Sequence, residues 1–222
     1  MRIGTWNLEG KWSDDHARLL GELACDVWLL TENVPLARPD GYDLHLTVDR
    51  MGEKKYWAGI ASRWPIDPLP DPDVASALGQ ISGVRFCSSV LPWKQAGQYS
   101  PWGGGSHGRE MAEVLGRLRP VLAEPPVVWG GDWNQPLSGN IQGFTRDAQR
   151  VLLGAVDAAG LVVPTQLLPG RPAGQQSIDH IAVPASWEVV DAGHVAVTPS
   201  LSDHDAYWIE VVAPGSTAPS HT

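Results

Sequence analysis

The sequence contains few cysteines and no excess of basic residues. Its two cysteines, Cys25 and Cys87, are too few for a disulfide framework or a zinc site, and each lies in an apolar stretch where we expect a buried free thiol. Sixteen Lys and Arg residues against 25 Asp and Glu residues leave a formal net charge of −9, which argues against architectural DNA binding. This charge does not exclude cleavage of phosphodiesters, because a divalent metal can supply positive charge locally.

Long apolar runs are also lacking. No segment approaches the roughly 18 residues of a membrane span, and no signal peptide precedes the first strand-like residues. We therefore expect a cytoplasmic, monomeric protein without a membrane partner. The length and the 43% hydrophobic content suit one large domain over residues 1–212. Residues 213–222, rich in Pro, Ser, Thr and Gly, are expected to form a disordered tail.

Short apolar runs alternate with a few amphipathic ones. Helices are predicted from Asp14 (with Ser13 as N-cap) to about Ala24, over Arg109–Ala123, and from Phe144 to about Ala159. Strands are predicted over Arg2–Glu9, Val27–Asn33, Tyr42–Val48, Tyr56–Ser62, Ile81–Leu91, Val127–Asn134, Ser177–Val183, Glu188–Val197 and Ala206–Val212. Because several strands are consecutive, the order favours an α/β (α+β) fold in which two mixed sheets pack face to face with helices outside.

Polar side chains cluster where these apolar strands begin or end. The clusters are Asn7 with Glu9, Glu32 with Asn33, Asp132 with Asn134, Asp179 with His180, and Ser202-Asp203-His204. A buried carboxylate is costly unless it is paired, hydrogen-bonded or bound to metal, so strand ends that meet would form one acidic pocket. Hard oxygen ligands of this kind suit Mg²⁺ or Mn²⁺ better than Zn²⁺. Each has a plain alternative: Asn7 could simply cap a turn, and Glu32 could be a surface acid at the end of a strand. Asp132 and Asn134 could form a turn, and Asp179 and His204 could be a structural ion pair.

These segments resemble a known superfamily. Thr5-Trp6-Asn7, Leu30-Thr31-Glu32, Gly131-Asp132-Trp133-Asn134, Ser177-Ile178-Asp179-His180 and Ser202-Asp203-His204 occur in the order typical of the endonuclease/exonuclease/phosphatase superfamily. The segment from Ala58 to Ile66 also looks like that superfamily, and the likeness spans Arg2 to about Val212. The resemblance implies a four-layer α/β sandwich and metal-dependent hydrolysis of phosphoesters.

The resemblance also implies roles for individual residues. Glu32 would be the main metal ligand, with Asn7 and Asp203 near the same ion. Asp132 would orient or deprotonate the attacking water, and Asn134 would hold that water or the phosphate.

An Asp–His pair is implied as well. Asp179 would fix the imidazole of His204 and favour its protonated form beside the phosphate. His180 is instead expected to be a hydrogen-bonded buried histidine, since strand alternation points it away from Asp179. Glu9 is left open between supporting the ligands and facing solvent, and Asp205 is expected at the surface.

The sequence departs from the superfamily in one strand. Many members carry a histidine or tyrosine at the end of the strand that corresponds to Ile81–Leu91, and this chain has none there. Tyr99 and His107 in the following segment are candidate replacements. We prefer His107 as a catalytic residue, because it precedes the start of a predicted helix, where an anion can bind. The segment could equally be only a long connection.

The substrate is less defined than the chemistry. We favour a phosphodiester of nucleic acid, cleaved by in-line attack of water with Mg²⁺ or Mn²⁺ as cofactor. Lys11, Lys54, Lys55 and Arg63 could supply scattered positive charge at one rim. A small-molecule or lipid phosphatase or phosphodiesterase of the same fold is the first alternative, and a non-catalytic binding member is the second.

Overall fold

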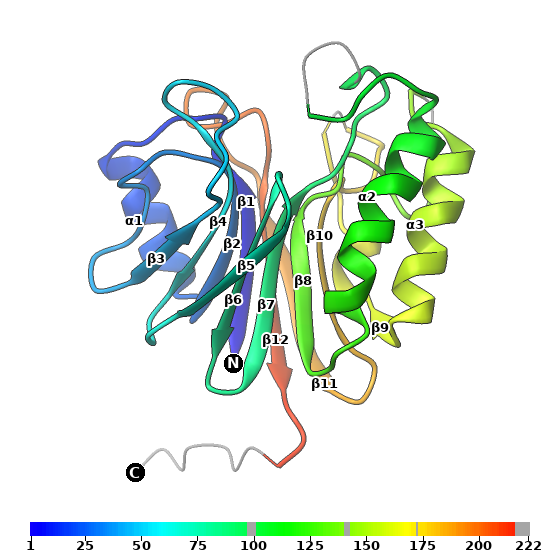
Figure 1. Cartoon of the computed structure of the whole chain (residues 1–222). Helices are drawn as coiled ribbons and strands as arrows, with labels where there is room; N and C mark the ends of the chain where they lie inside the picture. The colour runs from blue at the N-terminus through cyan, green and yellow to red at the C-terminus, as the bar shows by residue number, and fades with distance from the viewer. Residues whose placement is uncertain (97–100, 140–142, 172, 216–222) are drawn as a thin grey trace.

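Two β-sheets lie face to face at the centre of the molecule, and helices cover their outer faces (Figure 1). The computed structural model describes residues 1–96, 101–139, 143–171 and 173–215. The arrangement is the four-layer α/β sandwich expected from the sequence, so the predicted fold class is confirmed. Most of the predicted tail, and the candidate residue Tyr99, lie outside the described residues.

Each sheet has six strands. The first has the order β11-β12-β1-β2-β4-β3, and the second has the order β5-β6-β7-β8-β10-β9. The strands of the first sheet are β1 (Arg2–Asn7), β2 (Val27–Asn33), β3 (Asp43–Leu46), β4 (Tyr56–Ser62), β11 (Glu188–Val195) and β12 (Ala206–Val212). Those of the second are β5 (Asp67–Asp73), β6 (Ser76–Ile81), β7 (Val84–Val90), β8 (Val127–Asp132), β9 (Leu161–Val162) and β10 (Asp179–Pro184). The helices are α1 (Asp14–Leu23), α2 (His107–Leu122), α3 (Arg146–Ala158) and the short 3₁₀ helix η2 (Pro164–Leu167).

Each sheet contains a parallel pair of strands joined by a helical crossover. Strand β1 is parallel to β2, with α1 between them in the chain, and β7 is parallel to β8, with α2 between them. A parallel pair requires such a crossover, which explains why helices follow β1 and β7. The other pairs are antiparallel, so β10 and β12 begin at the edge where β8 and β1 end. This edge lies at the top of Figure 1 and gathers the polar strand ends.

Three apolar layers hold the sandwich together. The layer between the sheets includes Ile3, Leu29, Ile60, Phe86 and Val128, which come from both sheets. A second layer fills the space under α2 and α3, and a third lies under α1. The two cysteines are buried free thiols, as predicted. None of the helices in the described ranges is long and apolar enough to cross a membrane.

The predicted strand Ile81–Leu91 is wrong in its boundaries, because two strands meet there. Strand β6 ends at Ile81, and a turn at Ser82 and Gly83, with φ of 48° and 83°, leads into β7. Positive φ at both central positions of a two-residue turn is what a tight hairpin needs. Strand β5 is not among the predicted strands, and its sequence DPLPDPD is rich in proline, which lacks a backbone N–H. Because β5 lies at the edge of its sheet, it pairs with one neighbour only and tolerates the missing donors.

Candidate active site

Five predicted site residues meet at the upper edge of the two sheets. Asn7 ends β1, Glu32 lies near the end of β2, and Asp132 ends β8. Asp179 begins β10 directly opposite Asp132, and His204 lies two residues before β12. The chain therefore brings together residues from its first and last strands because both sheets direct these ends to one edge.

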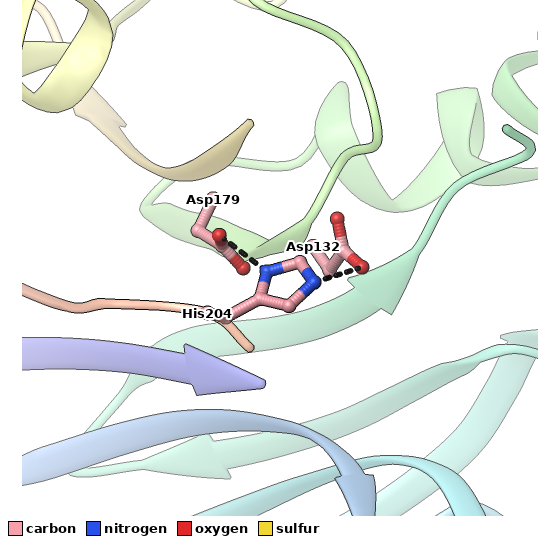
Figure 2. Close-up of side chains that lie close together, drawn as sticks. All are labelled: Asp132, Asp179 and His204. Carbon is pink, nitrogen blue, oxygen red and sulfur yellow. Dashed lines mark hydrogen bonds and ion pairs between the residues drawn. The ribbon is translucent and has the colours of Figure 1, made fainter. Parts of the chain in front are cut away.

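Asp132, Asp179 and His204 form a tight group (Figure 2). The Nδ1 atom of His204 lies 2.8 Å from Oδ2 of Asp179, and its Nε2 atom lies 3.9 Å from Oδ2 of Asp132. Both aspartates are buried, whereas the histidine side chain is 16% exposed. Within the described part of the chain, Nε2 makes no hydrogen bond, so its proton is available to a bound molecule.

Two serines of the sequence motifs hold this group in place. The Ser202 hydroxyl donates to the carbonyl of Asn7 at 2.7 Å and accepts from the backbone N–H of His204 at 3.0 Å. The Ser177 hydroxyl accepts from the N–H of Asp179 at 2.9 Å. Both hydroxyls are fully buried, so they fix the backbone from which the functional side chains project.

The electrostatics of the group follow from burial and close opposite charge. Burial alone would favour a neutral His204, but the carboxylates of Asp179 and Asp132 outweigh it and raise the pKa of the imidazole to about 10. Burial raises the pKa of Asp132 and of Asp179 above the usual value, against the opposing charge of His204. At neutral pH the site therefore holds a charged imidazole beside carboxylates that are better bases than exposed ones.

Asn7 links this group to Glu32. Its Nδ2 atom donates to Oδ2 of Asp132 at 3.0 Å and to Oε1 of Glu32 at 3.3 Å. Its Oδ1 atom accepts from the N–H of Glu9 at 2.8 Å. One amide thus holds two carboxylates from different sheets close together. The other oxygen of Glu32 lies 2.6 Å from Nζ of Lys55.

The backbone is strained at two of the predicted site residues. Glu32 and Asn134 have φ values of 48° and 52°, a left-handed conformation that residues other than glycine rarely adopt. Gly131, before Asp132, has a φ of 123°, and a Cβ there would lie 2.2 Å from the carbonyl oxygen of Ser89. The glycine of the Gly-Asp-x-Asn motif is thus required by close packing, and the strained positions direct side chains to the sheet edge.

Asn134 and Asp203 lie at the border of the group. The N–H of Asn134 donates to Oδ1 of Asp132 at 3.0 Å, while its Nδ2 donates to the Leu91 carbonyl at 3.0 Å. These two hydrogen bonds fix the orientation of the Asn134 side chain and therefore of its side-chain oxygen. Asp203 is 69% exposed, and its Oδ1 lies 3.9 Å from Nε2 of His204. Its N–H donates to the carboxylate of Glu9, so Glu9 supports this loop.

The donor set fits a hard divalent cation. Glu32 and Asp132 are held by the same amide nitrogen, and the buried Oδ1 of Asp179 has no hydrogen-bond partner among the described residues. Side-chain atoms of Asp132, Asp179 and His204 lie within 4.8 Å of one another and are also a candidate metal site. A protonated imidazole cannot ligate a metal, so the charge on His204 favours the Glu32 side of the edge.

His107 is not brought into this group. It is the first residue of α2, is 4% exposed, and has both ring nitrogens engaged: Nε2 with the Pro92 carbonyl at 2.7 Å and Nδ1 with the Thr145 hydroxyl at 3.0 Å. Burial lowers the pKa of the ring, which favours the neutral form that these contacts need. The geometry favours a structural role over the catalytic one preferred from the sequence.

Substitution of His107 separates these two roles. We expect His107→Ala to lower the free energy of unfolding by about 2 kcal/mol, because two buried polar groups lose their partner. The turnover of any substrate should stay within about twofold, since the ring contacts none of the reacting groups. Urea unfolding and initial rates measure the two effects. A large loss of rate at unchanged stability would restore the catalytic role.

Two ion pairs at the site are not indicated by the sequence. Lys55, which the sequence suggests only as scattered positive charge at a rim, pairs with Glu32. Asp205 is expected at the surface, but it is 5% exposed, pairs with Arg171 and accepts from the N–H of Val197. Arg171 thereby ties down the loop that carries His204. These pairings join distant segments, and no local signal in the sequence indicates them.

His180 is the buried, hydrogen-bonded histidine that strand alternation predicts. Its Nε2 lies 3.1 Å from the carbonyl oxygen of Gln135, and burial lowers its pKa to about 4. Its neutral ring belongs to the packing of the second sheet.

The structure thus combines a four-layer sandwich with an Asp–His pair, a second buried aspartate and a glutamate at one edge of the sheets. The chain belongs to the Endonuclease/Exonuclease/phosphatase family, whose sequence pattern matches residues 4–204. The resemblance inferred from the motifs is therefore confirmed. A comparison with curated proteins gave no match.

Solved structures share the fold at low sequence identity. The 3′ phosphatase NExo from Neisseria, bound to a product DNA hairpin, has a TM-score of 0.70 and 18% identity, covering 96% of this chain and 100% of its own. The AP endonuclease LMAP from Leishmania major has a TM-score of 0.66 and 15% identity, with coverage of 94% and 86%. Humanized D. rerio TDP2 has a TM-score of 0.62 and 16% identity, with coverage of 96% and 99%.

Proposed function

We propose that this protein is a divalent-metal-dependent phosphoester hydrolase that acts on nucleic acid. One observation carries the proposal: the imidazole of His204, anchored through Nδ1 on buried Asp179, has an Nε2 atom that makes no hydrogen bond among the described residues and lies 3.9 Å from Oδ2 of Asp132. Acid and base thus flank one point at the sheet edge. Phosphoester hydrolysis needs both a base for water and positive charge for the phosphoryl oxygens.

The residues of the chain divide this work. Asp132, held by Asn7 and by the backbone N–H of Asn134, orients the attacking water and accepts its proton. His204 donates from Nε2 to a phosphoryl oxygen, and Asp179 keeps that imidazole charged and correctly turned. Asn134 holds the water through its side-chain oxygen, which accepts from the water, or the phosphate through the N–H of Nδ2 that the Leu91 carbonyl does not use. Because these groups are fixed before substrate arrives, little reorganisation opposes the reaction.

We further propose that Mg²⁺ or Mn²⁺ is held at Glu32, with Asn7 and Asp203 near the same ion. Carboxylate and amide oxygens are the ligands that these hard cations prefer. When bound, the ion would neutralise charge on the phosphoryl oxygens, which a protein of net charge −9 otherwise repels.

Substitution of Glu32 tests this metal assignment. We expect Glu32→Ala to raise the Mg²⁺ concentration needed for half-maximal activity by about 10- to 100-fold, since a carboxylate ligand is lost. Activity measured across a Mg²⁺ series gives the value, and Glu22→Ala, on the exposed face of α1, is the matched control. An unchanged Mg²⁺ requirement would contradict the assignment.

Nucleic acid is the favoured substrate class. The support comes from two proteins of similar structure, an AP endonuclease and a 3′ phosphatase bound to a product DNA hairpin. Because the last of these is a 3′ phosphatase, a terminal phosphomonoester is the main alternative to a phosphodiester as the substrate. A small-molecule or lipid phosphoester would need the same acid and base at the sheet edge, whereas a non-catalytic binding role would need neither.

A substrate panel tests the proposal directly. The purified protein is incubated with Mg²⁺ or Mn²⁺ and supercoiled plasmid, single-stranded DNA, RNA, a 3′-phosphorylated oligonucleotide, an aryl phosphodiester and an aryl phosphomonoester. We expect metal-dependent cleavage of a nucleic acid that is lost in Asp132→Asn. Activity on the aryl phosphomonoester alone would replace the proposal with a small-molecule phosphatase. If the protein neither cleaves any of these substrates nor binds Mn²⁺, the result would favour the non-catalytic role.

A further inference from the structure

Lys55 lies against the predicted metal ligand Glu32. It occupies the position before β4, and its Nζ lies 2.6 Å from Oε2 of Glu32, with the two side chains 34% and 19% exposed. Among the described residues, it is the only lysine or arginine paired with a predicted metal ligand. The carboxylate that should attract a divalent cation is therefore already neutralised by a side chain of the same protein.

The path of Lys55 is built into the fold. A Cβ placed on Gly10 would lie 2.1 Å from Cδ of Lys55, so the lysine stem packs directly on the backbone of Gly10 and a larger residue there would displace it. Gly10 has a φ of 68°, and its N–H donates to the carbonyl of Glu32 at 2.9 Å. The carbonyl of Lys55 in turn accepts from the N–H of Met51 at 2.9 Å. The backbone and the side-chain stem of Lys55 are therefore held in place, and its ammonium group is directed to the carboxylate of Glu32.

We propose that Lys55 competes with the divalent cation for Glu32 and thereby sets the cation concentration at which the site fills. The inference rests on the proposed function, which places the cation at Glu32. An ammonium and a divalent cation cannot both hold Oε2 at contact distance without strong repulsion, so binding of the ion must displace the lysine. Loss of the lysine charge should therefore strengthen cation binding, the opposite of the effect of removing a ligand.

Binding of Mn²⁺ in the absence of substrate tests the competition. Free Mn²⁺ is measured by electron paramagnetic resonance for the wild type, Lys55→Met and the matched control Lys54→Met, whose exposed side chain neighbours Lys55. We expect Lys55→Met to bind Mn²⁺ about fivefold more tightly than the wild type, as the loss of a partly exposed ion pair implies. Lys54→Met should match the wild type.

The Mn²⁺ dependence of the Tm difference gives a second readout that a merely structural lysine would not move. In EDTA, Lys55→Met leaves Glu32 without a counter-charge, so its Tm should fall below that of the wild type; with Mn²⁺ added, the ion replaces the ammonium and the difference should shrink. Equal Tm differences with and without Mn²⁺, or Mn²⁺ affinity that is unchanged or weaker in Lys55→Met, would overturn the competition. Failure of both wild type and Lys55→Met to bind Mn²⁺ would overturn the metal site of the proposed function as well.

Discussion

Asp132→Asn is expected to lower kcat by at least about 100-fold, because the group that accepts the proton of the attacking water is lost. Asparagine has almost the same shape as aspartate. Its side-chain oxygen can still accept from the N–H of Asn134, so this contact and the packing at the sheet edge should persist. Since Glu32 and not Asp132 is the proposed main ligand, the affinity for Mn²⁺ should fall less than in Glu32→Ala. Single-turnover rates at saturating metal measure the first effect, and Mn²⁺ titration measures the second.

The two readouts separate chemistry from metal binding. The far-ultraviolet circular dichroism and Tm of Asp132→Asn show whether the fold is retained. Burial already raises the pKa of this carboxyl, so a neutral amide should not destabilise the protein through loss of charge. A rate within about threefold of the wild type would remove Asp132 from its role, and a loss of Mn²⁺ binding would make it a ligand instead.

Asp179→Asn should change the pH dependence of the reaction. The wild-type kcat/KM requires protonated His204, whose pKa is raised to about 10, and ionised Asp132, whose pKa burial raises to about 7, so the rate should rise through neutral pH and fall as pH passes the pKa of His204. Removing the Asp179 charge lowers the pKa of His204 toward the ordinary histidine value of about 6.5. The alkaline fall in rate therefore moves to lower pH, and at about pH 8.5 we expect about 10-fold or greater loss relative to the wild type at the same pH.

Profiles of kcat/KM against pH for the wild type and Asp179→Asn make this measurement. Asp132 still faces the ring in the variant, so the pKa should remain above that of a buried histidine without partners. His204→Gln is the matched control, because it removes the titrating group and should abolish the histidine-dependent alkaline fall altogether. An alkaline limb at the same pH in Asp179→Asn and in the wild type would show that this pair does not govern the protonation of the reacting group.

Much of the fold could be predicted from local patterns. The apolar runs of β2, β4 and β12 match the predicted strands residue for residue, because buried strands leave an uninterrupted signal. Helix α1 begins at Asp14 as predicted, with Ser13 at the N-cap. There the serine hydroxyl contacts His16 Nδ1 at 2.8 Å instead of a backbone N–H, which only side-chain packing decides.

Two strand boundaries could not be predicted. Strand β5 is missing from the predicted strands, because a sequence does not state whether a proline-rich segment lies at the edge of a sheet. The Ser82–Gly83 turn interrupts a run predicted as one strand. The catalytic role of His107 stays a prediction, although the carbonyl of Pro92 and the hydroxyl of Thr145 contact both of its nitrogens.

The class of the protein could be predicted without the structure, since polar motifs placed in order at strand ends depend only on the local chain. The sequence also indicates which side chains are candidates for the chemistry. Only the tertiary structure decided their pairing: Asn7 meets Asp132 across 125 residues, and Lys55 meets Glu32 across a sheet edge. The physical reason is that the charge, burial and hydrogen bonding of a group depend on neighbours that the fold, and not the local chain, brings within contact distance.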